Sequence, residues 1–159
     1  MIRVCFVCHA NICRSPVAEG LLQSLVNRAG LESEIAVESA GTHAVPGFER
    51  DRRSQATALG HGVQLHGHSR RFEPADFDDY GYVIALDHQN AETLRALARS
   101  DAERDRVRLL RDFDPESAPA AEVPDPYQGG IEGFEHVYQM IETACQALLE
   151  ELRRTHGLR

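Results

Sequence analysis

The stretch from Val4 to Ser15 constrains the fold of this chain more than any other. An apolar run from Ile2 to Val7 predicts a fully buried β-strand that ends at Cys8. Pro16 then occupies a favoured first position for a helix, and apolar residues recur after it at helical spacing. The segment from Cys8 to Arg14 is therefore predicted to be a loop that joins a buried strand to a helix N-terminus. Backbone N–H groups in such a loop, together with the helix dipole, form a site for an anion.

Cys8 lies at the base of this predicted anion site, and Arg14 lies at its rim. Thiolate is the reactive form of cysteine, and a helix N-terminus and a nearby arginine both favour it. The planar guanidinium of Arg14 can bind two oxygens of a phosphate at once. Ser15 can hydrogen-bond the sulfur as it attacks or leaves. These residue types in this order predict a cysteine nucleophile beneath a bound phosphoryl group.

A Cys-x5-Arg spacing alone is a weak signal, because four cysteines and seventeen arginines produce it readily by chance. The longer string from Cys8 to Pro16, CHANICRSP, resembles the signature loop of the low-molecular-weight protein tyrosine phosphatases, and the resemblance extends over nearly the whole chain. The family usually has glycine at the position of Ala10, so the added Cβ matters if the loop needs an unusual φ there. The loop residues that the resemblance implies for substrate binding are His9, Ala10, Asn11, Ile12, Cys13 and Ser15.

Strand patterns alternate with helical patterns along the chain, which predicts an α/β fold with three layers: a four-stranded parallel sheet with helices on both faces. We expect the flavodoxin-like strand order 2-1-3-4. At 159 residues, the chain is predicted to form one domain over residues 1–159. Beyond the first strand, the predicted strands are 34–39, 82–86 and 107–110. The predicted helices are 16–30, 51–59, 72–79 (a short turn), 90–98 and 134–152, followed by a charged tail expected to fray.

Ligands bind beyond the carboxyl ends of the strands in sheets of this kind. Cys8, Ser39, Asp87 and the loop after Leu110 all follow predicted strand ends. The topology therefore predicts that these segments meet at one edge of the sheet. Residues 39–42 are predicted to form a turn, and Asp87 is predicted to cap the next helix.

Asp125 is the candidate general acid, because a phosphoryl leaving group needs a proton and two flanking prolines restrict the backbone that carries this carboxyl. On pattern alone, an ordinary Asp-Pro turn is the better interpretation. The resemblance reverses this preference, because Asp125-Pro126-Tyr127 is similar to the general-acid motif of the family. Gln128 stands where many members have a second aromatic residue.

The resemblance also implies supporting roles. Asn11, Ser15, Ser39 and His68 would hold the loop in shape, with ordinary turn and cap hydrogen bonds as the alternative.

The pocket itself would be lined by Ile12 and Tyr127, with Phe48 in place of the aromatic residue that the family often carries there. The resemblance further implies that Cys13 forms a protective disulfide with Cys8 on oxidation, with a small buried apolar residue as the alternative. Cys5 and Cys145 are expected in the core.

These features together imply a metal-independent hydrolase without a cofactor, a protein-tyrosine-phosphatase that works through a phosphocysteine intermediate. A deep pocket suits phosphotyrosine, because phosphoserine is too short to reach its base. The resemblance to the family implies a partner protein that contains phosphotyrosine, with a tyrosine autokinase among the candidates. Phosphate and other oxyanions are expected to bind as product-like ligands.

Composition excludes several other classes. The net charge of −8 argues against general nucleic-acid binding. No apolar run approaches membrane-spanning length, and the N-terminus lacks a signal-peptide pattern. Four cysteines at irregular spacing suggest reduced thiols, so we expect a cytoplasmic protein.

Five alternative functions remain to be weighed. A zinc site from Cys5, Cys8, His9 and Cys13 lacks a second cluster of ligands. A nucleotide-binding Walker loop needs a lysine, and the chain has none. Arsenate reductases share the fold and loop but need further cysteines, and none occurs between Cys13 and Cys145. Protein-arginine phosphatases tend to carry threonine in place of Ile12. A phosphate-binding module without catalysis would not need its cysteine, arginine and aspartate together.

Overall fold

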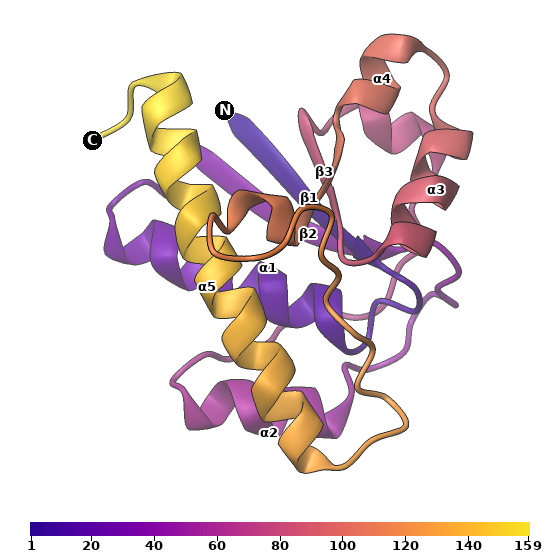
Figure 1. Ribbon diagram of the computed structural model, residues 1–159, viewed down its shortest axis with the longest axis vertical. Coiled ribbons are helices and arrows are strands. Elements are labelled where there is room, and N and C mark those ends of the chain that lie inside the picture. The colour runs from indigo at the N-terminus through magenta and orange to yellow at the C-terminus, as the bar shows by residue number, and fades with distance from the viewer.

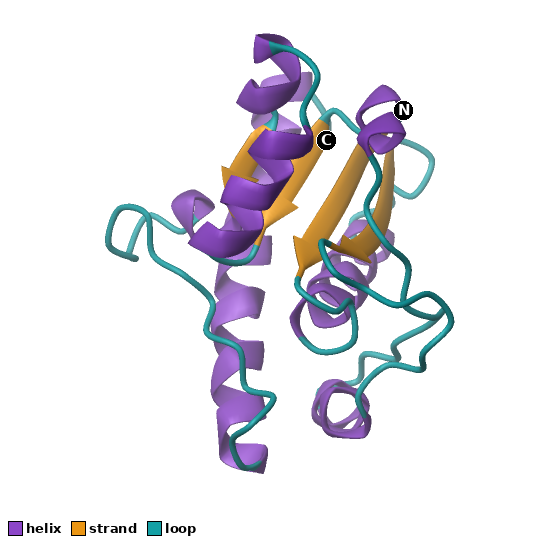
Figure 2. Cartoon of the chain, turned by 90° about the vertical axis from the view of Figure 1, so that its right-hand side faces the viewer, coloured by secondary structure: helices purple, strands orange, loops and turns teal.

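The computed structural model describes residues 1–159 and has a three-layered α/β architecture (Figures 1 and 2). Its four-stranded sheet has the order β2-β1-β3-β4 with every neighbouring pair parallel, which confirms the predicted flavodoxin-like order. The strands are β1 (Ile2–Cys8), β2 (Ile35–Gly41), β3 (Tyr82–Ala85) and β4 (Val107–Leu109). The α-helices are α1 (Arg14–Arg28), α2 (Arg52–Gly60), α3 (His88–Leu97), α4 (Asp101–Asp105) and α5 (Ile131–His156), and the 3₁₀ helices are η1 (Pro74–Asp78) and η2 (Leu110–Phe113).

The central strand β1 is buried on both faces. Successive side chains of a strand point in opposite directions. Val4, Phe6 and Cys8 therefore join the larger core cluster with α1 and α5, whereas Cys5 and Val7 join the cluster that includes α3 on the other face. Burial on both faces explains the uninterrupted apolar run of this strand.

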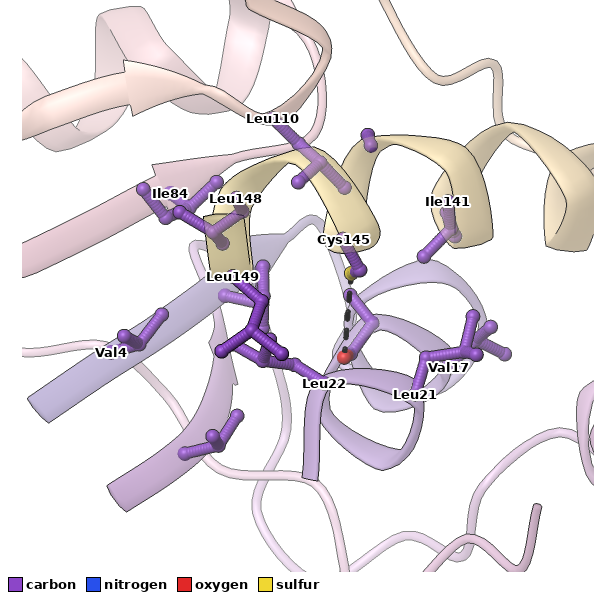
Figure 3. Packing of buried hydrophobic residues seen from close by; sticks show 14 of the residues in the cluster. Val4, Val17, Leu21, Leu22, Ile84, Leu110, Ile141, Cys145, Leu148 and Leu149 are labelled. Carbon is purple, nitrogen blue, oxygen red and sulfur yellow. Dashed lines mark hydrogen bonds between the residues drawn. The ribbon is translucent and has the colours of Figure 1, made fainter. Parts of the chain in front are cut away.

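The C-terminal helix α5 holds the larger cluster together. It packs along α1 and continues past the sheet to α2 (Figure 1). Figure 3 shows its apolar face, where Ile141, Cys145 and Leu148 lie toward α1 and the sheet. The Cys145 Sγ donates to the carbonyl oxygen of Ala18 at 3.8 Å, and burial raises the pKa of this thiol. Cys145 is therefore a packing group, as predicted.

Two boundaries near the predicted site differ from expectation. Helix α1 begins at Arg14, so Pro16 is its third residue. Proline is tolerated there because the first N–H groups of a helix have no acceptor within it. Strand β2 continues to Gly41, which pairs with Cys8, so the turn predicted over residues 39–42 is wrong for its first three residues.

The second half of the chain is more helical than predicted. The short helix α4 was not predicted; its N-cap Ser100 accepts a hydrogen bond from the N–H of Glu103. Helix α5 extends to His156, whose Nε2 lies 2.8 Å from the hydroxyl of Tyr82, and Gly157 ends it at a φ of 65°. The charged tail that we expected to fray is therefore helical up to His156. None of the helices combines the length and apolar character needed to cross a bilayer.

Candidate active site

One cavity of about 230 Å³ opens at the carboxyl end of β1, where the strand order reverses between β1 and β3. It brings together residues that the sequence separates by more than a hundred positions. Its lining consists of Cys8, His9, Ala10, Ile12, Cys13, Arg14, Asp125 and Tyr127. The nucleophile, the arginine and the acid predicted from the sequence therefore share one pocket.

The carbonyl oxygens of residues 8–15, which we call the Cys8–Ser15 loop, are bound on its outer side. Those of Cys8 and His9 accept hydrogen bonds from the N–H groups of Thr42 and His43, at 2.8 and 2.9 Å. Three more are bound by residues 50–54, which include the first turn of α2: that of Asn11 by Arg50 Nη1 at 2.7 Å, that of Ile12 by the Asp51 N–H at 2.9 Å, and that of Cys13 by Ser54 Oγ at 3.3 Å.

The N–H groups of the same loop are left free. In a trans peptide the N–H points opposite to the carbonyl, so the N–H groups that follow these carbonyls point away from the outer partners. No backbone N–H from His9 to Ser15 donates a hydrogen bond to another group of the protein. A run of unpaired amides at a helix N-terminus is a binding site for an anion, because each buried donor needs an acceptor.

Asn11 fixes the shape of the loop. Its φ of 59° lies in the left-handed region, which asparagine tolerates better than most residues. Its fully buried side chain donates to Ser15 Oγ and Ser39 Oγ, both at 2.9 Å, and its Oδ1 accepts from the N–H of Arg70 at 3.0 Å. Ala10 does not have a positive φ, so the loop accommodates its Cβ without backbone strain.

The Cys8 sulfur lies 2.9 Å from Ser15 Oγ. The hydroxyl oxygen of Ser15 already accepts from Asn11, so its own hydrogen is available to the sulfur or to the Ala40 carbonyl oxygen, which lies 3.3 Å away. A thiolate is the better acceptor of the two because it carries a full negative charge. The Ser15 hydroxyl is therefore placed to donate a hydrogen bond to the Cys8 sulfur.

Arg14 is 3% exposed, and its guanidinium contacts two other parts of the chain. Its Nη1 donates to Asp87 Oδ2 at 2.7 Å and to the Val123 carbonyl oxygen at 3.0 Å, and its Nη2 lies 3.8 Å from Asp125 Oδ2. Burial lowers the pKa of Arg14, but the nearby Cys8, Asp87 and Asp125 outweigh burial and raise it. Arg14 is therefore a buried, fixed cation that lines the pocket.

Asp87 binds Arg14 in addition to its predicted role as the N-cap of the next helix, α3. Its Oδ1 accepts from the N–H of Asn90 at 2.8 Å, which confirms it as the N-cap of α3. The second oxygen binds Arg14, a contact between residues far apart in the sequence that no local pattern indicates.

Asp125 and Tyr127 form the outer wall of the pocket, and each is about half exposed. The Asp125 Oδ1 accepts from the Tyr127 N–H at 3.0 Å, which holds the carboxyl across a tight turn and leaves Oδ2 facing Arg14. Arg53 of α2 contacts the segment 125–129 at two points. Its guanidinium lies 5.4 Å from the centre of the Tyr127 ring, and its Nη1 donates to the Gly129 carbonyl oxygen at 3.2 Å. Sequence reasoning missed Arg53.

Two predicted site residues lie elsewhere. The His68 side chain is exposed and makes no hydrogen bond to Asn11, so its predicted supporting role is wrong. The adjacent Ser69 points inward instead, where its hydroxyl accepts from the Phe48 N–H and donates to the Val45 carbonyl oxygen. Side chains alternate along such an extended segment, so His68 faces outward. The Phe48 ring is 59% exposed and does not line the pocket, which corrects its predicted place there.

The cysteines have separate surroundings. All four are free thiols, and Cys5 and Cys8 lie in clusters on opposite faces of the sheet, which rules out the zinc site considered above. Cys13 lines the pocket beside Cys8. Burial, with the negative charges of Asp51, Asp125 and Cys8, raises the pKa of Cys13 to about 12. Cys13 is therefore a protonated thiol at neutral pH.

Comparison with known proteins identifies relatives along the whole chain. The sequence model of a family described as "Low molecular weight phosphotyrosine protein phosphatase" matches residues 3–157. A low molecular weight protein-tyrosine-phosphatase of Streptomyces coelicolor is 42% identical over 153 residues, which cover 95% of this chain and 93% of the relative.

Solved structures agree with the sequence match. A protein tyrosine phosphatase of Entamoeba histolytica superimposes with a TM-score of 0.91 at 30% identity, over 98% of this chain and 99% of the other. A Cys→Ser variant of the arginine phosphatase YwlE, with a phosphorylated active-site serine, superimposes with a TM-score of 0.88 at 25% identity, over 99% of this chain and all of the other.

Proposed function

Because the chain belongs to the low molecular weight phosphotyrosine protein phosphatase family, and is thus a hydrolase, we propose that it hydrolyses phosphotyrosine in proteins through a phosphocysteine formed on Cys8. The observation that carries this proposal is the run of unpaired amides from His9 to Ser15, with the Cys8 sulfur, Arg14 and Asp125 in the same pocket. These groups match the charge and shape of a transferring phosphoryl group.

The reaction has two displacements. In the first, the Cys8 thiolate attacks phosphorus, the S–P bond forms, and the bond from phosphorus to the tyrosyl oxygen breaks. Protonated Asp125 gives its proton to that oxygen, so tyrosine leaves neutral. The loop amides and Arg14 bind the non-bridging oxygens throughout.

In the second displacement, water attacks the phosphocysteine, gives its proton to Asp125 and releases inorganic phosphate, and the thiolate returns. The phosphorylated serine in the YwlE variant supports a covalent phosphoryl group at this position.

The pocket wall favours an aromatic substrate. Ile12 and Tyr127 both line the cavity, and their apolar surfaces can hold a phenyl ring while the phosphate reaches the loop. An arginine phosphatase is the second candidate, because YwlE shares the fold. The bulk of Ile12 supports the aryl substrate over phosphoarginine. A tyrosine autokinase is the partner that we propose as a physiological substrate.

The test is hydrolysis of p-nitrophenyl phosphate across pH in EDTA, with wild type, Cys8→Ser and Asp125→Ala. We expect activity in EDTA that Cys8→Ser abolishes and Asp125→Ala lowers by about 10²–10⁴-fold. Phosphotyrosine and phosphoarginine peptides then separate the two substrates. A wild type that binds phosphate but turns over no ester under reducing conditions would support the binding module instead.

A further inference from the structure

Arg50 is a buried cation to which the proposed reaction gives no role. It is 6% exposed, and each of its nitrogens has a partner. Its Nε donates to the His66 carbonyl oxygen at 3.1 Å, and its Nη1 donates to the carbonyl oxygen and the Oδ1 of Asn11, at 2.7 and 3.0 Å. Its Nη2 lies 3.7 Å from Glu19 Oε1. Burial lowers the pKa of Arg50, and the nearby Glu19 and Cys8 oppose this effect.

The contacts of Arg50 with the Cys8–Ser15 loop are shorter than its contact with Glu19. Burying a guanidinium is costly unless its donors are satisfied. The contact with Glu19 is longer than a hydrogen bond, whereas both contacts with Asn11 are of hydrogen-bond length. One nitrogen thus binds Asn11 through its backbone and its side chain together, and Asn11 is the only loop residue with a positive φ.

The loop orientation follows from this pair of bonds. The Arg50 bond to the Asn11 carbonyl turns the Asn11–Ile12 peptide outward, so the Ile12 N–H points to the opposite side. The bond to Oδ1, which also accepts from the Arg70 N–H at 3.0 Å, helps to orient the Asn11 amide so that its Nδ2 donates to Ser15, which in turn contacts the Cys8 sulfur. A continuous hydrogen-bond chain therefore runs from a buried positive charge to the nucleophile.

We propose that Arg50 is a positioning residue for phosphoryl transfer, which sets the Asn11–Ile12 peptide toward the bound phosphate and directs Ser15 toward the Cys8 sulfur. This proposal rests on the proposed function of the same pocket. The competing explanation is that Arg50 only neutralises Glu19, whose carboxylate also accepts from Ser39 Oγ.

Four variants separate these explanations. Arg50→Met removes the charge and all hydrogen-bond donors, and Arg50→Lys keeps the charge but loses the planar guanidinium with its several donors. The double variant Glu19→Gln/Arg50→Met leaves no unpaired carboxylate behind. Arg52→Met is the matched control, because Arg52 is exposed and makes no ion pair. For each variant, kcat and KM for p-nitrophenyl phosphate, the inhibition constant of inorganic phosphate and the urea midpoint are measured.

We expect Arg50→Met to lower kcat/KM by about 10–100-fold and to weaken phosphate inhibition, because small displacements of the groups that bind the phosphate cost rate on this scale. The double variant should stay as impaired as Arg50→Met in kcat/KM, and Arg50→Lys should recover part of the activity. If Arg50→Met does not fold, the double variant and Arg50→Lys carry the test.

Two results would overturn the proposal. One is a kcat/KM of Arg50→Met within about twofold of that of Arg52→Met. The other is full recovery of kcat/KM in the double variant, which would show that Arg50 acts only by neutralising Glu19. Failure of the proposed function is distinguishable, since it appears as absent turnover in wild type. In that case, equilibrium binding of inorganic phosphate to wild type and to the Arg50 variants still decides whether Arg50 shapes the loop.

Discussion

Asp87 links helix α3 to Arg14 in the pocket. Substitutions of this residue separate the stabilisation by the helix cap from the stabilisation by the ion pair with Arg14. Its Oδ1 caps the helix through the Asn90 N–H at 2.8 Å, and its Oδ2 binds Arg14 at 2.7 Å. Asp87→Asn retains the cap, because asparagine caps about as well as aspartate. It removes the negative charge from an arginine that is only 3% exposed. Asp87→Ala removes both interactions.

The expected losses follow from these contacts. A hydrogen bond to a charged group contributes about 1.5–3 kcal/mol, so Asp87→Asn should lower the free energy of unfolding by about that amount. Water at the 19% exposed Asp87 side chain favours the lower half of this range. Asp87→Ala should lose about 1 kcal/mol more, the value of the cap. For a domain of this size, about 1 kcal/mol shifts Tm by roughly 2–4 °C.

Urea unfolding followed by circular dichroism measures these differences, with p-nitrophenyl phosphate hydrolysis as the functional readout. Both variants should also lose kcat, because Arg14 is then held only by the Val123 carbonyl oxygen and Asp125. A free energy of unfolding for Asp87→Asn equal to that of wild type would refute a net stabilising Arg14–Asp87 pair. Equal losses for Asp87→Asn and Asp87→Ala would refute the separate contribution of the cap.

Three further predictions concern the surroundings of the loop. A Cβ at Gly41 would lie 2.7 Å from the His9 carbonyl oxygen and 2.9 Å from the Asn11 nitrogen, so Gly41→Ala should lower kcat/KM by at least about tenfold and weaken phosphate inhibition; unchanged kinetics would contradict this close approach. After peroxide treatment, added thiol should restore wild type much better than Cys13→Ser, and equal recovery of the two would argue against a protective disulfide. Burial raises the pKa of Glu19 above its ordinary 4.5. The protonated carboxyl therefore contributes stability that is fully present below pH 4.5 and is lost as pH rises through the raised pKa. In urea titrations from pH 4 upward, the free energy of unfolding of Glu19→Gln should therefore not show the decline expected of wild type. Parallel pH profiles for wild type and Glu19→Gln would contradict this prediction.

Sequence reasoning succeeded where one local pattern carried the information. The apolar run into Cys8 and the helical spacing after Pro16 predicted the strand, the loop and the helix, and the alternation of elements predicted the parallel sheet. Helix α4 was missed because its sequence, DAERD, has no apolar face to give a helical period.

The partners behind the loop could not be predicted in the same way. Arg50 and Arg70 reach Asn11 from segments far along the chain, and nothing in their neighbourhoods distinguishes them from exposed arginines. His68 and Phe48 were misplaced because an extended segment determines which neighbour faces inward only after it has packed.

The proposed anion site consists of main-chain amides and the Arg14 guanidinium, and this has a consequence for how selectivity can change. The side chains of His9, Ala10 and Ile12 line the pocket, while the groups that would bind phosphate are Arg14 and the peptide N–H groups of the loop. Randomising these three positions should therefore alter the choice among phosphate esters and leave inhibition by inorganic phosphate nearly constant. Recognition of the leaving group is evolvable in this architecture, because it is encoded separately from capture of the phosphoryl group.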